Sequence, residues 1–295
     1  MYLAWGSTFF AIKVGVAHFS PSGLGAIRFS IASLLMLAAW GALRGARAVR
    51  PSVRQSLTAA GVGIVLVGGG NAGLAYAETT VPSSVCALVI GCSPMLFALF
   101  DRLAGGPALD RRQIFGGLFA TAGVAVLALE GRAGPALAFP LSGLAVLFAG
   151  MVCWTGASVV SKRLSLPKDT LLTAGIQNLA ASAAFLVVAL GRGEMRLGDL
   201  AHLRADTWGA ILYLAVVGSC IGFTAYAWLL AHEPIHRASS YAFVNPVVAV
   251  FLGTTFGGER LTPGIAGAIV LILAGVALAM LRDAQHDPPA ASPPS

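Results

Sequence analysis

The sequence has few charged residues for its length. Of its 295 residues, 11% are Asp, Glu, Lys or Arg, whereas soluble domains carry about 25%. Hydrophobic residues make up 57% of the chain, and the mean hydropathy is +0.82. So few charges cannot form a water-exposed surface, and the apolar runs lack the polar stripe of a surface helix. The composition therefore excludes an ordinary soluble domain and predicts a membrane protein.

Acidic residues and cysteines are also scarce. Twelve Asp and Glu stand against 19 Lys and Arg, which gives a formal net charge of +7. The basic residues lie in short connections between apolar runs, without interleaved aromatic residues. They indicate orientation toward anionic lipid, and no nucleic-acid partner is expected. The four cysteines lie inside apolar runs and form no CxxC pair, so we expect neither a disulfide framework nor a metal site.

Apolar runs of about 18 to 22 residues recur along the chain, a length that crosses a ~30 Å hydrocarbon layer as a helix. The first begins almost at Met1 and has no basic n-region, so we interpret it as a span and not as a signal peptide. The polar, proline-rich tail is predicted to be disordered. We predict an all-α membrane protein with ten transmembrane helices, at residues 2–18, 22–43, 57–77, 82–100, 113–130, 141–161, 170–190, 208–230, 237–256 and 264–281, followed by the tail 283–295.

Two halves of the chain share a pattern at a nearly constant offset. Asn245-Pro246 stands 152 positions after Ser93-Pro94, and Trp154 stands 149 positions after Trp5. The tripeptide Ala225-Tyr226-Ala227 also occurs 150 positions earlier. A single offset linking separated points indicates duplication.

The duplication predicts two five-helix repeats, at residues 1–130 and 141–282. Five is an odd number of spans, so the second repeat must enter the bilayer upside down relative to the first. Inverted repeats of this kind are typical of transporters, in which cargo binds where the two repeats meet. Lys and Arg divide unequally between the two sets of connections, 12 against 5. The richer set is expected to face the cytoplasm, so we predict both termini to be cytoplasmic.

Three segments carry a resemblance to a known family. They are WGSTFFAIK at 5–13, PSGLGAIRF at 21–29 and SYAFVNPVVAVFLGTTFGGERL from Ser240. The chain resembles, over nearly its whole length, the EamA family of the drug/metabolite transporter superfamily. The resemblance implies a ten-helix inverted-repeat carrier in a bacterial inner membrane, often an exporter of amino acids or related small metabolites. Gln177 stands where the repeat offset from Arg28 would place a basic residue, so the halves are not expected to bind cargo symmetrically.

Three ionisable residues fall within or at the ends of predicted spans. Lys13, Arg28 and Glu78 lie at one predicted depth, near the outer side. Charges at the membrane centre cost about 2.5 to 3.5 kcal/mol on insertion scales and are functional candidates. We predict a charge cluster that binds the carboxylate and amine of a zwitterion, with Glu78 able to accept a coupling proton. The alternative is that Lys13 and Arg28 reach lipid headgroups while Glu78 lies in water.

Polar and aromatic residues complete the candidate cavity. Tyr241 and Asn245 share a helix face at i, i+4. Pro94 and Pro246 each remove one helical hydrogen bond and are predicted to break or bend their helices. Packing or an interfacial belt is the alternative role for these side chains. The predicted substrate-binding set is Trp5, Asn71, Glu78, Trp154, Gln177, Tyr241 and Asn245.

Two motif matches suggest other functions. Residues 68–73 fit GxGxxG, but they continue a membrane-length apolar run, so no dinucleotide or other cofactor is expected. Residues 232–236 fit HExxH, but Pro234 interrupts the helix that would have to hold both histidines. An intramembrane zinc hydrolase using His232, Glu233 and His236 is therefore an alternative to a transporter, as is a membrane scaffold. The cargo, the coupling ion and the oligomeric state are left open.

Overall fold

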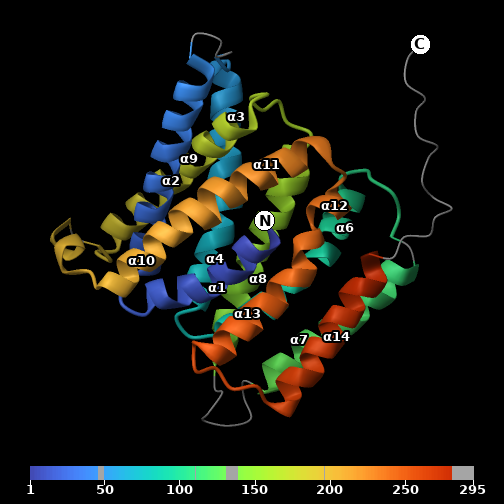
Figure 1. The fold of residues 1–295 in the computed structure, drawn as a ribbon. Coiled ribbons are helices and arrows are strands. Elements are labelled where there is room, and N and C mark those ends of the chain that lie inside the picture. Colours follow the sequence, from blue (N-terminus) through green and yellow to red (C-terminus); the bar gives the residue numbers. More distant parts are fainter. Residues whose placement is uncertain (46–49, 110, 131–138, 196, 281–295) are drawn as a thin grey trace, which may run out of the picture.

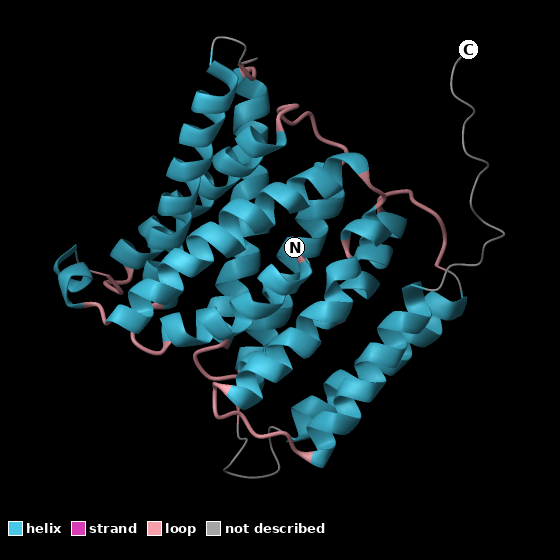
Figure 2. Cartoon of the chain, in the orientation of Figure 1, coloured by secondary structure: helices cyan, strands magenta, loops and turns pink. Residues whose placement is uncertain are grey.

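The structure is a computed structural model that describes residues 1–45, 50–109, 111–130, 139–195 and 197–280. Over these ranges the regular structure is helical, without strands (Figure 2). The tail that was predicted to be disordered lies outside the described residues.

The first repeat contains five helical stretches. They are α1 (Tyr2–Val16), α2 (Pro21–Arg44), a continuous third helix, a fourth helix divided at Cys92, and α7 (Arg111–Glu130). The third helix comprises α3 (Val53–Gly63), the π-helical η2 (Ile64–Gly69) and α4 (Gly70–Ala77), and the fourth comprises α5 (Ser83–Gly91) and α6 (Ser93–Leu103).

The second repeat follows the same plan. It contains α8 (Leu141–Ser161), α9 (Thr170–Gly191), the short 3-10 helix η3 (Leu197–His202), a continuous third helix, a divided fourth helix and α14 (Pro263–Met280). The third helix comprises α10 (Ala205–Tyr213), the π-helical η4 (Leu214–Ile221) and α11 (Gly222–His232). The fourth comprises α12 (Ile235–Ala238), η5 (Ser240–Phe243) and α13 (Val244–Thr255).

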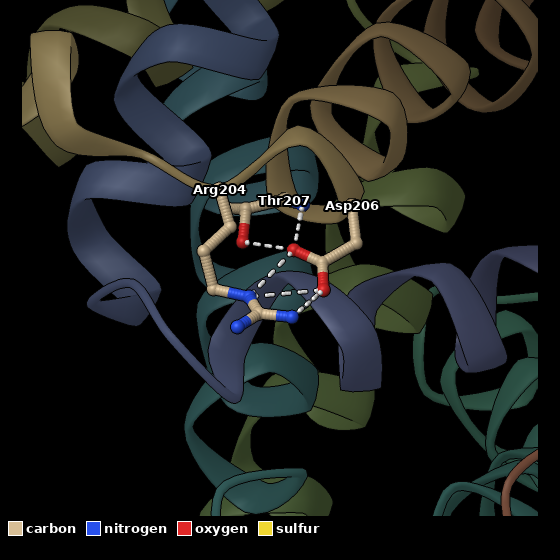
Figure 3. A network of polar contacts seen from close by, with 3 residues as sticks. All are labelled: Arg204, Asp206 and Thr207. Atoms are coloured by element: carbon tan, nitrogen blue, oxygen red, sulfur yellow. Dashed lines mark hydrogen bonds and ion pairs between the residues drawn. The ribbon is translucent and has the colours of Figure 1, made fainter.

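Side-chain hydrogen bonds mark the start of the third helix in each repeat. Ser52 and Gln55 form a reciprocal capping box at the start of α3. At the start of α10, Asp206 accepts hydrogen bonds from the Arg204 guanidinium, at 2.9 Å from Nη2, and from the backbone N–H of Thr207 (Figure 3). A carboxylate here satisfies an otherwise free N–H and complements the positive end of the helix dipole. The third helix of the first repeat thus begins with a capping box, and that of the second begins with a carboxylate inside its first turn.

The predicted membrane fold is confirmed, with one correction to the spans. Seven helices among the described residues are long and apolar enough to cross a bilayer, and Val244–Thr255 and Pro263–Ala279 are shorter apolar helices. The number of ten crossings stays a prediction. The stretch predicted as one span at 237–256 is instead broken into α12, η5 and α13. Pro246 lies in the first turn of α13, where its missing N–H costs no helical hydrogen bond.

Equivalent helices of the two repeats pair with each other. The second helices, α2 and α9, pack together at one side of the molecule, and the fifth helices, α7 and α14, at the opposite side (Figure 1). Between these pairs, the first helix of each repeat crosses to the other repeat: α1 packs on α13 and α10, and α8 packs on α4 and α6. This reciprocal exchange places the first, third and fourth helices of both repeats at the centre.

Candidate functional site: a cavity between the two repeats

A cavity of about 80 Å³ lies at the centre, where helices of both repeats meet. Ligand sites that bury a small molecule usually measure about 300–1,000 Å³, so this cavity is smaller than a typical ligand site. Its lining is mainly aromatic and apolar with a few polar groups. The lining residues are Trp5, Thr8, Phe9, Arg28, Gly70, Asn71, Leu74, Ile90, Ser93, Gly150, Met151, Trp154, Phe223, Tyr241 and Asn245.

Arg28 supplies the charge in this lining. Its side chain extends from α2 and is 4% exposed. Nε donates to Ser219 Oγ at 3.0 Å, and Nη1 donates to Asn71 Oδ1 at 3.3 Å. A guanidinium has five N–H donors and stays protonated. The described residues provide it with no carboxylate partner, so the cavity holds an uncompensated positive charge.

Asn71 orients this guanidinium. Its Nδ2 donates to the backbone oxygen of Val67 at 2.8 Å, which directs Oδ1 toward Arg28. The Val67 carbonyl belongs to η2. A π-helical turn shifts the helical hydrogen-bond register and so frees backbone groups for side-chain contacts. The predicted role of Asn71 in the cavity therefore has a local structural cause in the π-helix.

The two tryptophans predicted to be equivalent meet in the cavity wall. The Trp5 and Trp154 rings lie 5.4 Å apart in an edge-to-face arrangement, and Tyr241 lies 4.9 Å from Trp5. Trp154 Nε1 donates to Tyr241 Oη at 2.9 Å, and Trp5 Nε1 donates to the Gly218 carbonyl at 3.1 Å. Edge-to-face pairs are stabilising geometries for aromatic rings. Both indole N–H groups are therefore satisfied.

Glycines on the third helices make room for these tryptophans. A Cβ at Gly222 would overlap Trp5 Nε1, and a Cβ at Gly70 would lie 3.0 Å from Trp154 Cε3. Gly70 and Gly222 are 152 positions apart, so each tryptophan packs on the equivalent glycine of the other repeat. The two equivalent contacts show that the pseudo-twofold relation between the repeats extends to side chains.

The two proline-linked pairs also meet at the cavity. Ser93 and Asn245, which precede Pro94 and Pro246, both line it. Asn245 is 3% exposed, and its Oδ1 has no hydrogen-bond partner in the described part of the chain. A buried amide oxygen without a donor costs about 1–3 kcal/mol. Asn245 therefore presents an unused acceptor at the cavity, and a cargo N–H or O–H can satisfy it.

The predicted charge cluster of Lys13, Arg28 and Glu78 is not formed. Arg28 joins the central cavity, while Lys13 and Glu78 lie together at one end of the bundle. Lys13 Nζ donates to the backbone oxygens of Glu78 and Val81, at 2.7 and 3.3 Å, at the end of α4. Glu78 is fully buried, and both of its carboxylate oxygens lack hydrogen-bond partners among the described residues. The three residues share a predicted depth but face different neighbours.

Gln177 lies outside the central cavity. It lines a second cavity of about 370 Å³ near the ends of α8 and α11, together with Lys162, Thr173 and Tyr226. Phe223 lines both cavities. Because the two cavities share Phe223, we refer to the second one as the vestibule.

The structure also shows an unexpected symmetry between lysines. Lys162 Nζ donates to the backbone oxygens of Leu230 and Glu233, at 2.6 and 2.7 Å, at the end of α11. These acceptors stand 152 positions after those of Lys13, and Lys162 stands 149 positions after Lys13. The sequence held this signal, because Lys162 follows Trp154 at the same spacing as Lys13 follows Trp5.

One predicted repeat match is wrong, although the duplication itself is present. Tyr76 Oη donates to Glu194 at 2.9 Å, whereas Tyr226 packs on Trp5 and Trp154 in the central aromatic wall. The Ala-Tyr-Ala tripeptides therefore do not occupy equivalent places. The contacts of the third helices fit the offset of 152 and not 150.

Glu259 is a site residue that the sequence did not single out. Its Oε1 accepts from the backbone N–H and the hydroxyl of Ser83, both at 2.7 Å, and Oε2 accepts from the N–H of Ser84 at 3.1 Å. A residue of the second repeat thereby caps α5 of the first at the end of the bundle where Lys13 lies. The free N–H groups at Ser83-Ser84, with no acidic residue in the first turn, were the available signal.

The zinc-hydrolase alternative receives no support. His232 Nδ1 lies 2.9 Å from the Trp228 carbonyl, and Glu233 pairs with Arg237 at 3.1 Å. The His236 side chain lies outside what the structure describes. Among the described side chains, no group of three potential ligands is placed to hold a metal.

Comparison with known proteins identifies the family and the fold. The EamA-like transporter family matches residues 1–129 and again residues 141–281. The uncharacterized inner membrane transporter YedA of Escherichia coli K12 is 35% identical over 265 residues, covering 89% of this chain and 82% of YedA. The fold also matches a protein chain in a solved crystal structure, with a TM-score of 0.70 and 25% identity. The alignment covers 95% of this chain and 93% of the other.

Two further relatives have names that mention amino acids. A probable terminal-alkyne amino-acid exporter of Streptantibioticus cattleyicolor is 26% identical, covering 91% of this chain and 90% of that protein. A probable amino-acid metabolite efflux pump of Salmonella typhimurium is 26% identical, covering 93% and 90%. The relatives are named as transporters or exporters and not as enzymes. The chain belongs to the EamA-like transporter family and is a multi-pass inner membrane transporter of a small molecule.

Proposed function

We propose that this chain is a secondary transporter that exports small carboxylate-bearing metabolites, such as amino acids, by alternating access. The observation that carries the proposal is Arg28, a buried guanidinium without a carboxylate partner in the described structure, at the cavity between the repeats. An uncompensated charge inside a membrane protein is costly, and such residues are functional candidates by default. A cargo carboxylate would pair with two parallel N–H groups of the guanidinium.

The contacts at the two ends of the bundle support alternating access. At one end Glu259 joins the second repeat to α5 of the first, while the 370 Å³ vestibule approaches the cavity from the other. Rocking of one repeat against the other would break the Glu259 contacts and close the vestibule. With both termini cytoplasmic, the Glu259 end would face outward, so cargo would enter through the vestibule and leave past Glu259.

Counterflow in proteoliposomes tests the proposal. Proteoliposomes that contain the purified protein are preloaded with one unlabelled compound, and uptake of the same compound in labelled form is followed. The panel comprises amino acids, their N-acyl derivatives, nucleosides and cationic drugs. We expect saturable counterflow of a carboxylate compound, which Arg28→Gln lowers at least about tenfold, because hydrogen bonds to charged groups contribute about 1.5–3 kcal/mol. Arg54→Gln, a change at an exposed arginine on α3, is the matched control.

Uptake that is no faster than in empty liposomes for the whole panel contradicts transport by this chain. Equal uptake by Arg28→Gln and Arg54→Gln contradicts the role given to Arg28.

Glu78 is the proposed coupling group. A fully buried carboxyl without hydrogen-bond donors is more stable neutral than ionised, and opening of the Lys13 end would let it release a proton. Glu78→Gln is expected to remove the dependence of flux on a pH gradient while leaving counterflow intact. Flux of the variant that still follows the gradient, measured beside wild type, excludes Glu78. Wild-type flux that ignores the gradient indicates that cargo moves down its own gradient.

A further inference from the structure

The charges around the central cavity restrict the net charge of the cargo. Arg28 carries one positive charge, and the lining contains no Asp or Glu. The described carboxylates with polar partners have those partners outside the lining. Five of them form ion pairs with arginines: Asp169 with Arg44, Asp101 with Arg163, Glu194 with Arg192, Asp206 with Arg204 and Glu233 with Arg237. Two others accept hydrogen bonds, Glu259 from Ser83 and Ser84, and Glu130 from Thr262. Glu78 lies with Lys13, about two helical turns along from Asn71.

A zwitterion does not neutralise such a site. Its carboxylate would pair with Arg28, but its ammonium would then be a buried cation facing neutral groups. Burial of an unpaired charge is expensive. A monoanion pairs with the guanidinium and leaves the complex neutral.

Asn245 supplies an unused acceptor in the lining, and this acceptor fits a neutral donor. Asn245 Oδ1 accepts nothing in the described structure and is 97% buried, since 3% of the residue is exposed. One amide N–H or hydroxyl satisfies it fully. The aromatic wall of Trp5, Trp154 and Tyr241 suits an apolar group on the same molecule.

We propose that the preferred cargo is a monoanionic carboxylate with a neutral hydrogen-bond donor and an apolar group, such as an amino acid whose amine is acylated, over the free zwitterion. This inference rests on the proposed function and narrows its substrate class. Arg28 binds the carboxylate, Asn245 accepts from the amide N–H, and the aromatic wall contacts the apolar group.

The preference for a cargo of net charge −1 over a zwitterion is the charge rule of this site. Equilibrium binding to the purified full chain in nanodiscs tests it. The probes are N-acetyl-L-phenylalanine, L-phenylalanine and L-phenylalaninamide, which carry net charges of about −1, 0 and +1 at neutral pH. We expect the N-acetyl compound to bind at least about tenfold more tightly than L-phenylalanine, and L-phenylalaninamide most weakly. Arg28→Gln is expected to weaken binding of the N-acetyl compound about tenfold to a hundredfold, with Arg54→Gln as control.

An added negative charge in the lining gives a test that does not depend on loss of binding. Asn245→Asp adds one negative charge to the lining, so the site becomes neutral and the preference is expected to shift toward L-phenylalanine. If Asn245→Asp does not fold, Asn245→Ala is measured, and it is expected to lower affinity for the N-acetyl compound more than for phenylpropanoate, which has no N–H.

The outcomes separate this inference from the proposed function. Tighter binding of L-phenylalanine to wild type, or absence of binding of all three probes, overturns the inference while leaving counterflow of other carboxylates possible. Tight binding of the N-acetyl compound without counterflow supports the charge rule and contradicts transport. An unchanged order of affinities in Asn245→Asp also overturns the inference.

Discussion

Trp5 occupies its place in the cavity wall only because residue 222 has no side chain. A Cβ at Gly222 would overlap Trp5 Nε1, which donates to the Gly218 carbonyl. At the equivalent position of the other repeat the fit is looser, because a Cβ at Gly70 would lie 3.0 Å from Trp154. A single methyl group at either glycine therefore tests whether the wall must stay closely packed.

Gly222→Ala is expected to displace Trp5 and to lower both the thermal unfolding midpoint and cargo affinity, because overpacking a core costs about 1–3 kcal/mol. Gly70→Ala should show a smaller loss. Gly209→Ala, in the same third helix as Gly222 but with nothing within 4 Å of its Cβ, is the control and should keep both values. Thermal unfolding in detergent and probe binding measure the series. Equal behaviour of Gly222→Ala and Gly209→Ala would contradict the close contact.

At the scale of elements, each repeat ties its first helix to the end of its third through a lysine. Lys13 and Lys162 each donate to two backbone oxygens at a helix end, where carbonyls otherwise lack partners. Lys13 is part-buried, whereas Lys162 is exposed. The two ties thus have the same geometry in different surroundings.

Lys13→Met is expected to destabilise the protein by on the order of 1–3 kcal/mol, because it leaves buried carbonyls unsatisfied. Lys162→Met should cost less, since water can replace the lost donor. Lys168→Met, at an exposed lysine in the α8–α9 connection, serves as the reference. Thermal unfolding of the three variants side by side gives the order, and a loss in Lys162→Met as large as in Lys13→Met would refute the explanation by burial.

The elements also show why the sequence predicted some site residues and not others. Spacing along a helix gives depth, because each residue rises 1.5 Å, and it placed Lys13, Arg28 and Glu78 at one level. Depth does not reveal which neighbour a helix faces, so the predicted cluster failed. The repeat pattern did better: it paired Trp5 with Trp154 and Ser93 with Asn245, and the structure brings both pairs to the cavity.

The π-helices and the Glu259 cap could not be predicted from the sequence. The π-helices η2 and η4 change the hydrogen-bond register inside otherwise ordinary apolar runs. Glu259 lies in a connection, and its capping of Ser83 and Ser84 follows only from the fold. The Ala-Tyr-Ala match was misleading because an apolar segment of small residues still resembles its counterpart when the two are aligned two positions out of register.

At the scale of the whole molecule, the two repeats share the central cavity. Arg28 of the first repeat and Asn245 of the second line it together. Neither repeat alone contains both groups, so binding requires the interface. Under the proposed alternating access, the cavity of about 80 Å³ and the Glu259 cap at one end belong to one of at least two arrangements.

The most direct test is chemical access to this cavity from each side of the membrane. A Ser93→Cys variant, with the four native cysteines replaced by alanine, is placed in oriented vesicles and treated with a membrane-impermeant maleimide from one side or the other. The account predicts labelling from both sides and slower labelling from both when transported cargo is present. Labelling from one side alone, or rates that cargo leaves unchanged, would contradict a cavity that opens alternately and binds the cargo.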